Sequence, residues 1–223
     1  STQPIVRNLS EKVSKALACL RMPNFPWQVE VARKPELHDR SAIVAGKALD
    51  LSEELTPVSM KNAVRSSGAN SLSTRVVLSA SPDLTDVMPG MPLMEAASRH
   101  RGVLIIEADI PLYALVFDDI IENLERLVPD IEAAAPGLAY VGIWGLEGLY
   151  GDDAHVVRLL ASAIDNFDLR IGVGDNKWLA YAASLLSRSN SGRKVTGEHG
   201  RFLDRFPVDS LPVPYSLIKR LHA

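Results

Sequence analysis

Short apolar runs of the length of a buried strand recur along the first half of the chain. They lie at residues 16–20, 41–46, 75–80 and 103–107, bounded by charged or turn-forming residues. Such runs are typical of strands that are covered on both faces of a sheet. A further apolar segment at 132–145 is interrupted by Pro136 and Gly137 and has the pattern of a short hairpin. The spacing therefore predicts several short strands rather than a helical bundle.

Two longer stretches have the period of an amphipathic helix. Residues 110–128 place apolar side chains on one face and acidic ones opposite. Residues 151–167 predict a second helix, which Asp152 or Asp153 is suited to cap. Residues 47–74 are polar and rich in Ser, Asn and Gly, which predicts a loop or short helix inserted between strands. The apolar face of the first helix is predicted to comprise Leu112, Leu115, Val116, Ile120, Leu124, Leu127 and Val128.

Composition indicates an ordinary soluble globular protein with a reducing environment. The 223 residues are 47% hydrophobic and 23% charged. No apolar run approaches the roughly 20 residues of a membrane span, and the first residues lack the layout of a signal peptide. The lone Cys19 excludes an internal disulfide and is interpreted as a small buried strand residue. A cytoplasmic protein without membrane contact is expected.

The charge is distributed unevenly. The net charge of −3 opposes strong binding of nucleic acid, and acidic residues dominate the middle of the chain. Basic residues gather near the end, so any DNA contact is predicted there, with a solvated basic face as the alternative. Arg188, Arg193 and Lys194 are the candidates for contacts to a DNA backbone.

Four segments, in order and at sensible separations, resemble motifs of the Y-family (lesion-bypass, UmuC-like) DNA polymerases. The segment 132–151 is similar to the central palm motif, and 21–30 to the opening motif. The segment 80–96 is similar to the motif around the sequence GMPL, and 171–184 to the motif around NK-x-L-A. The resemblance covers nearly the whole chain from about residue 16. The positions that match the family are Phe25, Val29, Glu30, Val87, Gly90, Met91, Pro92, Leu93, Glu95, Ala96, Glu132, Ala139, Tyr140, Gly145, Asn176, Lys177, Leu179, Ala180, Ala183 and Ser184.

The same alignment places other residue types where the family has its magnesium-binding carboxylates. Those positions fall on Arg21, Gly137 and Leu138. The family Tyr and Arg that grip the triphosphate fall on Ala80 and Asp83, and an Arg-to-Asp exchange replaces attraction with repulsion. Magnesium requires hard oxygen ligands in near-octahedral geometry. The resemblance therefore implies no catalytic residue, no metal site and no cofactor.

Three other positions keep residues that the resemblance connects with nucleotide binding. Lys177 matches the lysine that reaches the triphosphate in active members. Tyr113 matches the tyrosine that begins a palm helix, and Phe25 keeps its place in the opening motif. We interpret them as relics of nucleotide or phosphate contacts, with a packed aromatic as the alternative for Tyr113.

The fold implied by the resemblance is α+β, with a ferredoxin-like βαββαβ palm, a small fingers insertion and the start of a helical thumb. Residues 1–24 would hold a lead-in and the first palm strand. Residues 25–100 would form the fingers-like region, with 47–74 inserted. The palm would occupy 101–188, and a truncated thumb 189–223.

The function implied is that of a non-catalytic homologue in DNA repair and translesion synthesis, within the bacterial SOS response. It is most similar to the inactive mutasome subunits of the ImuB type. Such a protein would act at the nucleoid as a scaffold that joins an error-prone or replicative polymerase, the sliding clamp, a recombinase-like partner and DNA. Two alternatives stay open. One is an active nucleotidyltransferase whose Mg²⁺ ions are held by displaced ligands. The other is a ferredoxin-like interaction domain unrelated to DNA.

Overall fold

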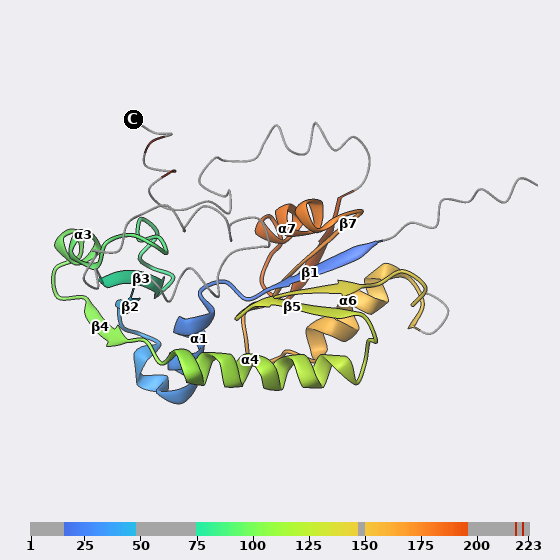
Figure 1. Cartoon of the computed structure of the whole chain (residues 1–223), viewed down its shortest axis with the longest axis horizontal. Helices are drawn as coiled ribbons and strands as arrows, with labels where there is room; N and C mark the ends of the chain where they lie inside the picture. The colour runs from blue at the N-terminus through green and yellow to red at the C-terminus, as the bar shows by residue number, and fades with distance from the viewer. Residues whose placement is uncertain (1–15, 48–74, 147–149, 196–216, 218–219, 221–223) are drawn as a thin grey trace, which may run out of the picture.

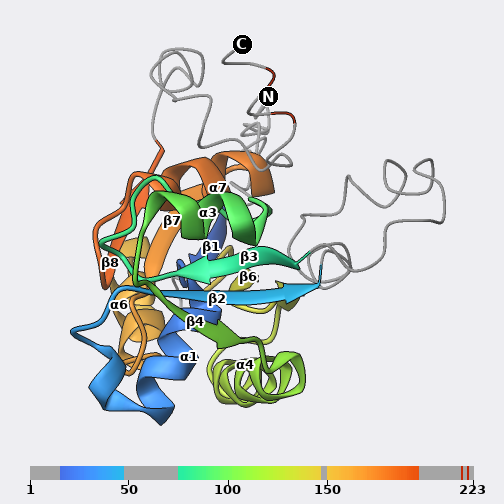
Figure 2. The same ribbon diagram turned by 90° about the vertical axis from the view of Figure 1, so that its left-hand side faces the viewer.

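The computed structural model describes residues 16–47, 75–146 and 150–195, together with 217 and 220. Its strands form a five-stranded sheet in the order β5-β6-β1-β7-β8 and a three-stranded sheet in the order β3-β2-β4 (Figures 1 and 2). The larger sheet contains β1 (Leu17–Arg21), β5 (Ile131–Ala135), β6 (Leu138–Gly142), β7 (Arg170–Gly174) and β8 (Ser191–Lys194). The smaller contains β2 (Ala42–Lys47), β3 (Arg75–Ala80) and β4 (Leu104–Glu107).

The larger sheet has the strand order of a ferredoxin-like βαββαβ unit. β1 lies in its middle and pairs antiparallel with both β6 and β7. β5 forms the outer arm of the β5–β6 hairpin, and β8 adds a parallel strand beside β7. The predicted α+β fold with a ferredoxin-like sheet is confirmed by this order.

Helices cover both faces of this sheet. α4 (Ile110–Glu125) and α6 (Asp153–Ser162) lie on one face, and α7 (Lys177–Leu185) lies on the other (Figure 1). Because side chains of a strand alternate between faces, Ala18 and Leu20 of β1 point toward α4 and α6, whereas Cys19 contacts α7. Burial raises the pKa of the Cys19 thiol to about 12, which leaves the thiol neutral and confirms the interpretation of a buried strand residue.

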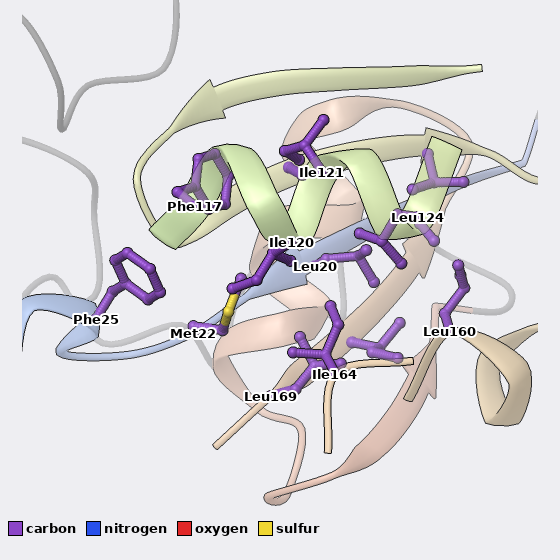
Figure 3. Close-up of a cluster of buried hydrophobic side chains, with 14 of the residues drawn as sticks. Leu20, Met22, Phe25, Phe117, Ile120, Ile121, Leu124, Leu160, Ile164 and Leu169 are labelled. Carbon is purple, nitrogen blue, oxygen red and sulfur yellow. The ribbon is translucent and has the colours of Figure 1, made fainter. Parts of the chain in front are cut away.

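The main hydrophobic core lies between β1, α1 (Phe25–Arg33), α4 and α6. Phe25 of α1 packs edge-on against Phe117 of α4, with the ring centroids 5.7 Å apart. Figure 3 shows these two rings as neighbours, with Met22 and Ile120 nearby. A 3₁₀ turn, η1 (Pro35–Leu37), follows α1 and buries Leu37 in the same core. The core thus fixes the end of β1 against the start of α1.

The three-stranded sheet has a separate core on its other face. α3 (Leu93–Arg99) packs Leu93 and Ala96 against Ile43 and Val77 of the sheet. β2 pairs antiparallel with β3 and parallel with β4. No helix in the described ranges is long and apolar enough to cross a membrane.

Most predicted elements are confirmed. The bounds of the four apolar runs shift by one residue at most, whereas the two predicted helices, 110–128 and 151–167, end earlier, at 125 and 162. The four apolar runs are β1, β2, β3 and β4, the hairpin is β5–β6, and Asp152 caps α6 by accepting a hydrogen bond from the His155 N–H at 2.9 Å. The predicted apolar face of α4 was wrong at Leu115, which is 60% exposed. The buried face turns instead toward the sheet through Tyr113, Phe117, Ile120, Ile121 and Leu124.

The sheets do not end at the predicted domain boundaries. β4 lies after residue 101 and pairs with β2 in the smaller sheet. β8 lies after residue 188 and pairs with β7 in the larger sheet. The predicted insertion, 47–74, lies outside the described residues except for Lys47, the last residue of β2, and residues 196–223 of the predicted thumb lie outside them except for 217 and 220.

A buried hydrogen bond joins α1 to α4 beneath the core. The Tyr113 hydroxyl donates to Glu30 Oε1 at 2.8 Å, and Arg33 Nη2 lies 3.0 Å from Glu30 Oε2. Glu30 is fully buried, and burial raises the pKa of the Tyr113 phenol, which keeps it protonated as the donor. We expect Tyr113→Phe to lower the free energy of unfolding by about 1–3 kcal/mol, because one oxygen of a buried carboxylate is left without its partner.

Urea denaturation measures this change, and Tyr150→Phe is the matched control. The Tyr150 hydroxyl donates to the Leu127 carbonyl at 2.9 Å in a part-buried position, so its removal costs about 0.5–1.5 kcal/mol. Equal effects of the two substitutions would contradict a special role for the Tyr113–Glu30 hydrogen bond.

Candidate functional site

The three positions that the resemblance aligns with the family carboxylates lie side by side at one end of the larger sheet. Arg21 ends β1 and is the direct cross-strand partner of Leu138, which begins β6. The Met22 N–H donates to the Gly137 carbonyl at 2.8 Å, which closes the same end of the ladder. The β5–β6 turn is therefore held against the β1–α1 turn, and residues 21, 137 and 138 form one site.

Gly137 leaves no room for a side chain at this site. Its φ of +82° lies in the left-handed region, which strains any residue with a Cβ atom. A Cβ built there would lie 2.5 Å from Phe25 Cβ and 2.9 Å from Phe25 Cγ. Phe25 itself is 2% exposed, in contact with Phe117 and with Phe167 at 5.4 Å between centroids. Packing of α1 thus occupies the space that an aspartate at 137 would need.

Arg21 directs its guanidinium toward the face of the sheet that α7 covers. Its Nε donates to Ser184 Oγ at 3.3 Å, and Ser184 Oγ donates in turn to the Tyr181 carbonyl at 2.7 Å. Burial lowers the pKa of the Arg21 guanidinium, and the neighbouring Arg170 lowers it further, although Tyr181 opposes the shift. Position 21 therefore carries a largely buried cation in contact with the last turn of α7.

These residues do not fit a magnesium ion. Magnesium takes carboxylate and other hard oxygen ligands, whereas this site offers a guanidinium, a glycine and a leucine. A cation at position 21 repels a second cation in the same place. Across the described part of the chain, no group of three or more His, Cys, Asp or Glu side chains is placed to hold a metal ion.

The two positions that the resemblance aligns with the triphosphate-binding Tyr and Arg, Ala80 and Asp83, also carry residues of a different character. Ala80 is buried at the end of β3. Asp83 is exposed and accepts a hydrogen bond from Ser41 Oγ at 2.5 Å. The Ser41 and Ser81 hydroxyls hold the pKa of the Asp83 carboxyl below its ordinary value, so it remains an anion at this position. A carboxylate there repels a phosphate.

The three predicted relics of nucleotide binding are placed apart from one another. Lys177 begins α7 on the same face as Arg21, forms an ion pair with Glu132 and lies 5.4 Å from the centre of the Tyr140 ring. Phe25 lies in the core behind the site, and Tyr113 is 1% exposed and bonded to Glu30. Of these three, Lys177 has its charged group at the surface.

The three candidates for DNA-backbone contacts lie together beyond α7. Arg188 is exposed in the turn before β8, and Arg193 and Lys194 are exposed on β8 itself. Lys194 forms an ion pair with Asp153 at 2.5 Å, and Arg193 Nη1 donates to the Leu186 carbonyl at 3.3 Å. A groove of about 670 Å³ lies between β8 and the first turns of α6. The structure thus brings these cations to one edge of the sheet.

Arg170 is a site residue that the sequence did not single out. It begins β7 and is the direct cross-strand partner of Arg21, so the two guanidinium-bearing side chains leave the sheet on one face. The positions are separated by most of the chain. Only the strand register makes them neighbours, and no spacing in the sequence could have indicated it.

The buried β1, the hairpin beside it and the strand order are those of a ferredoxin-like polymerase palm. A comparison with models of protein families gives the same result. Residues 20–185 match the impB/mucB/samB family (IMS), and the chain belongs to that family. A search of curated proteins finds no match.

Solved structures of DNA polymerases share the fold. The chain is 18% identical to the protein in an insertion ternary complex of Dbh DNA polymerase, with a TM-score of 0.67, over 93% of this chain and 57% of that one. It is 19% identical to DinB from Sulfolobus solfataricus, with a TM-score of 0.67, over 93% and 56%. For a Y-family DNA polymerase chimera of Dbh and Dpo4 the identity is 19% and the TM-score 0.65, over 92% and 56%. The chain therefore spans a little over half the length of these proteins, and the likeness concerns the fold.

Proposed function

We propose that this chain is a non-catalytic, polymerase-like member of its family, which acts in damage tolerance as a scaffold at DNA. The proposal is supported by the site at the end of β1: the resemblance aligns Arg21, Gly137 and Leu138 with the family's carboxylates, and Phe25 fills the space beside Gly137. Nucleotidyl transfer on this fold uses two metal ions that bind the triphosphate and activate the primer hydroxyl. Without ligands for these metal ions, the palm keeps its fold but does not catalyse nucleotidyl transfer.

The role of scaffold follows from what the chain retains. The family fold is intact, while its metal-binding chemistry is replaced by a cation. Two of its remaining exposed features suit macromolecular contacts: the basic edge at Arg188, Arg193 and Lys194, and the acidic face of α4. By family resemblance, the partners would be an error-prone polymerase, the sliding clamp and DNA, in a cytoplasmic, nucleoid-associated assembly.

Primer extension tests the loss of catalysis. We expect no extension of a plain primer–template by this chain, with magnesium or with manganese, beside an active Y-family polymerase as the positive control. Extension that co-purifies with the chain and disappears on Asp175→Asn, Asp168→Asn or another carboxylate substitution would contradict the proposal, because it would reveal displaced metal ligands.

Binding of DNA tests the basic edge. We expect the triple variant Arg188→Gln, Arg193→Gln, Lys194→Gln to weaken binding of duplex DNA uniformly across sequences. The slope of log affinity against log salt should fall by about one for each phosphate that is no longer neutralised. A charge-matched control replaces three arginines that are exposed elsewhere, Arg40, Arg101 and Arg126, with glutamine. Equal weakening by both triple variants would contradict a role for this edge.

A further inference from the structure

Two arginines stand directly opposite each other at the degenerate metal site. Arg21 of β1 and Arg170 of β7 are cross-strand partners on the face covered by α7. Like charges in directly opposite positions destabilise a sheet unless something neutralises them. The pair therefore needs an anion, from the chain or from elsewhere.

The chain supplies only part of that neutralisation. Arg170 Nη2 lies 3.6 Å from Asp168 Oδ2, a long ion pair. Arg21 forms no ion pair within the described ranges, and Ser184 is its hydrogen-bond partner there. Two cations thus share one carboxylate, which leaves a net positive charge.

Two polar atoms of this cluster are buried without a hydrogen-bond partner among the described residues: Arg170 Nε and Asp168 Oδ1. A buried donor without an acceptor is costly, and a buried cation without a counter-ion more so. Burial is the main cause that lowers the pKa of Arg21, and Arg170 lowers it further, whereas Tyr181, Cys19 and Asp168 oppose the shift. An oxyanion beside Arg170 would accept from its free Nε–H and offset the net positive charge of the pair, whereas Asp168 Oδ1 is an acceptor that an anion does not satisfy.

We propose that Arg21 and Arg170 form a phosphate-binding site that works without a metal ion. The inference rests on the proposed function, because it assigns a ligand to the site from which the catalytic carboxylates are missing. Guanidinium groups present planar pairs of N–H donors that match phosphate oxygens, and they do not lose their charge at neutral pH. The phosphate group can come from a nucleoside triphosphate or from a DNA backbone.

The test measures binding of three probes to the chain in excess EDTA: tripolyphosphate, dATP and a short fluorescein-labelled oligothymidine. We expect tripolyphosphate to bind, and Arg170→Gln to weaken its binding about tenfold or more, as for removal of a charge-assisted hydrogen bond. Arg126→Gln is the matched control, since Arg126 is exposed at the end of α4 on the opposite face. Whether dATP or oligothymidine shows the same dependence on Arg170 identifies the source of the phosphate.

Arg21→Met separates binding from folding. It keeps most of the side-chain volume and removes a buried, unpaired cation, so the variant should unfold at the same temperature as the parent or higher. Tripolyphosphate should raise the unfolding temperature of the parent chain and of Arg126→Gln, but not that of Arg21→Met.

Three results would overturn the inference: no binding of any probe in EDTA, unchanged binding by both Arg170→Gln and Arg21→Met, or equal weakening in Arg126→Gln. None of them bears on catalysis. Conversely, metal-dependent primer extension would overturn the proposed function even if the phosphate site were found.

Discussion

Gly137→Ala is expected to destabilise the chain by roughly 2–5 kcal/mol, the sum of left-handed backbone strain and of overpacking. The φ of +82° accounts for the first part, and the approach of the new Cβ to Phe25 Cβ, 2.5 Å away, for the second. Phe25 cannot move aside easily, because Phe117 and Phe167 contact its ring. Urea denaturation measures the destabilisation.

Gly145→Ala separates the two contributions. Gly145 has a φ of +80°, but a Cβ there would have no atom within 4 Å, so backbone strain of about 1–2 kcal/mol is the whole expected cost. Equal destabilisation by the two substitutions would show that Phe25 moves away from the new Cβ at 137 without a loss of stability. If the account holds, restoring aspartate at 21 and 137 and glutamate at 138 impairs folding before it can restore a metal site.

Gly172→Ala is expected to have the largest effect on stability. A cost of about 4 kcal/mol or more is exceptional for a single substitution and is expected here from severe overpacking. A Cβ at this position of β7 would lie 2.0 Å from the Ala180 carbonyl oxygen and 2.2 Å from the Ser184 nitrogen. Both are backbone atoms of α7, so no rotation of a side chain relieves the clash. α7 must move away from the sheet as a unit.

Gly192→Ala in the adjacent strand is the control. There the new Cβ would meet a methyl group of Val157 at 2.3 Å, and a side chain can shift where a backbone cannot, so the expected cost is about 1–3 kcal/mol. Near-ultraviolet circular dichroism reports on α7 directly, because the rings of Trp178 and Tyr181, both on this helix, stack with their centroids 6.3 Å apart. A destabilisation at 172 no larger than at 192, with the aromatic signal intact, would contradict the close docking of α7.

The strands and the long helix could be predicted because local pattern determines them. Apolar runs of strand length and the cap at Asp152 depend on neighbours in the sequence, and each was confirmed within a residue or two. The face of α4 was predicted less well. Leu115 fits the helical period but points to solvent, since Tyr113 and Phe117 turn the helix toward α1 and the sheet.

The candidate site was also only partly predictable from the sequence. The resemblance alone places Arg21, Gly137 and Leu138 at positions where the family has carboxylates. Their consequences are not visible in the sequence, because they depend on register and packing between distant segments. The Arg21–Arg170 pair comes from the β1–β7 register, and the exclusion of a side chain at Gly137 comes from the position of Phe25. Motif comparison singles out positions 21, 137 and 138, whereas the fold shows what surrounds them.

The affinity for dATP, measured by isothermal titration in EDTA, in magnesium and in manganese, shows whether this palm has lost metal-dependent binding of a nucleotide. A catalytic palm binds the triphosphate through its metal ions, so metal tightens binding of the nucleotide. We expect that neither magnesium nor manganese tightens the binding of dATP to this chain. Tightening by about tenfold or more, equivalent to ~1.4 kcal/mol, would contradict it and would point to metal ligands elsewhere in the chain.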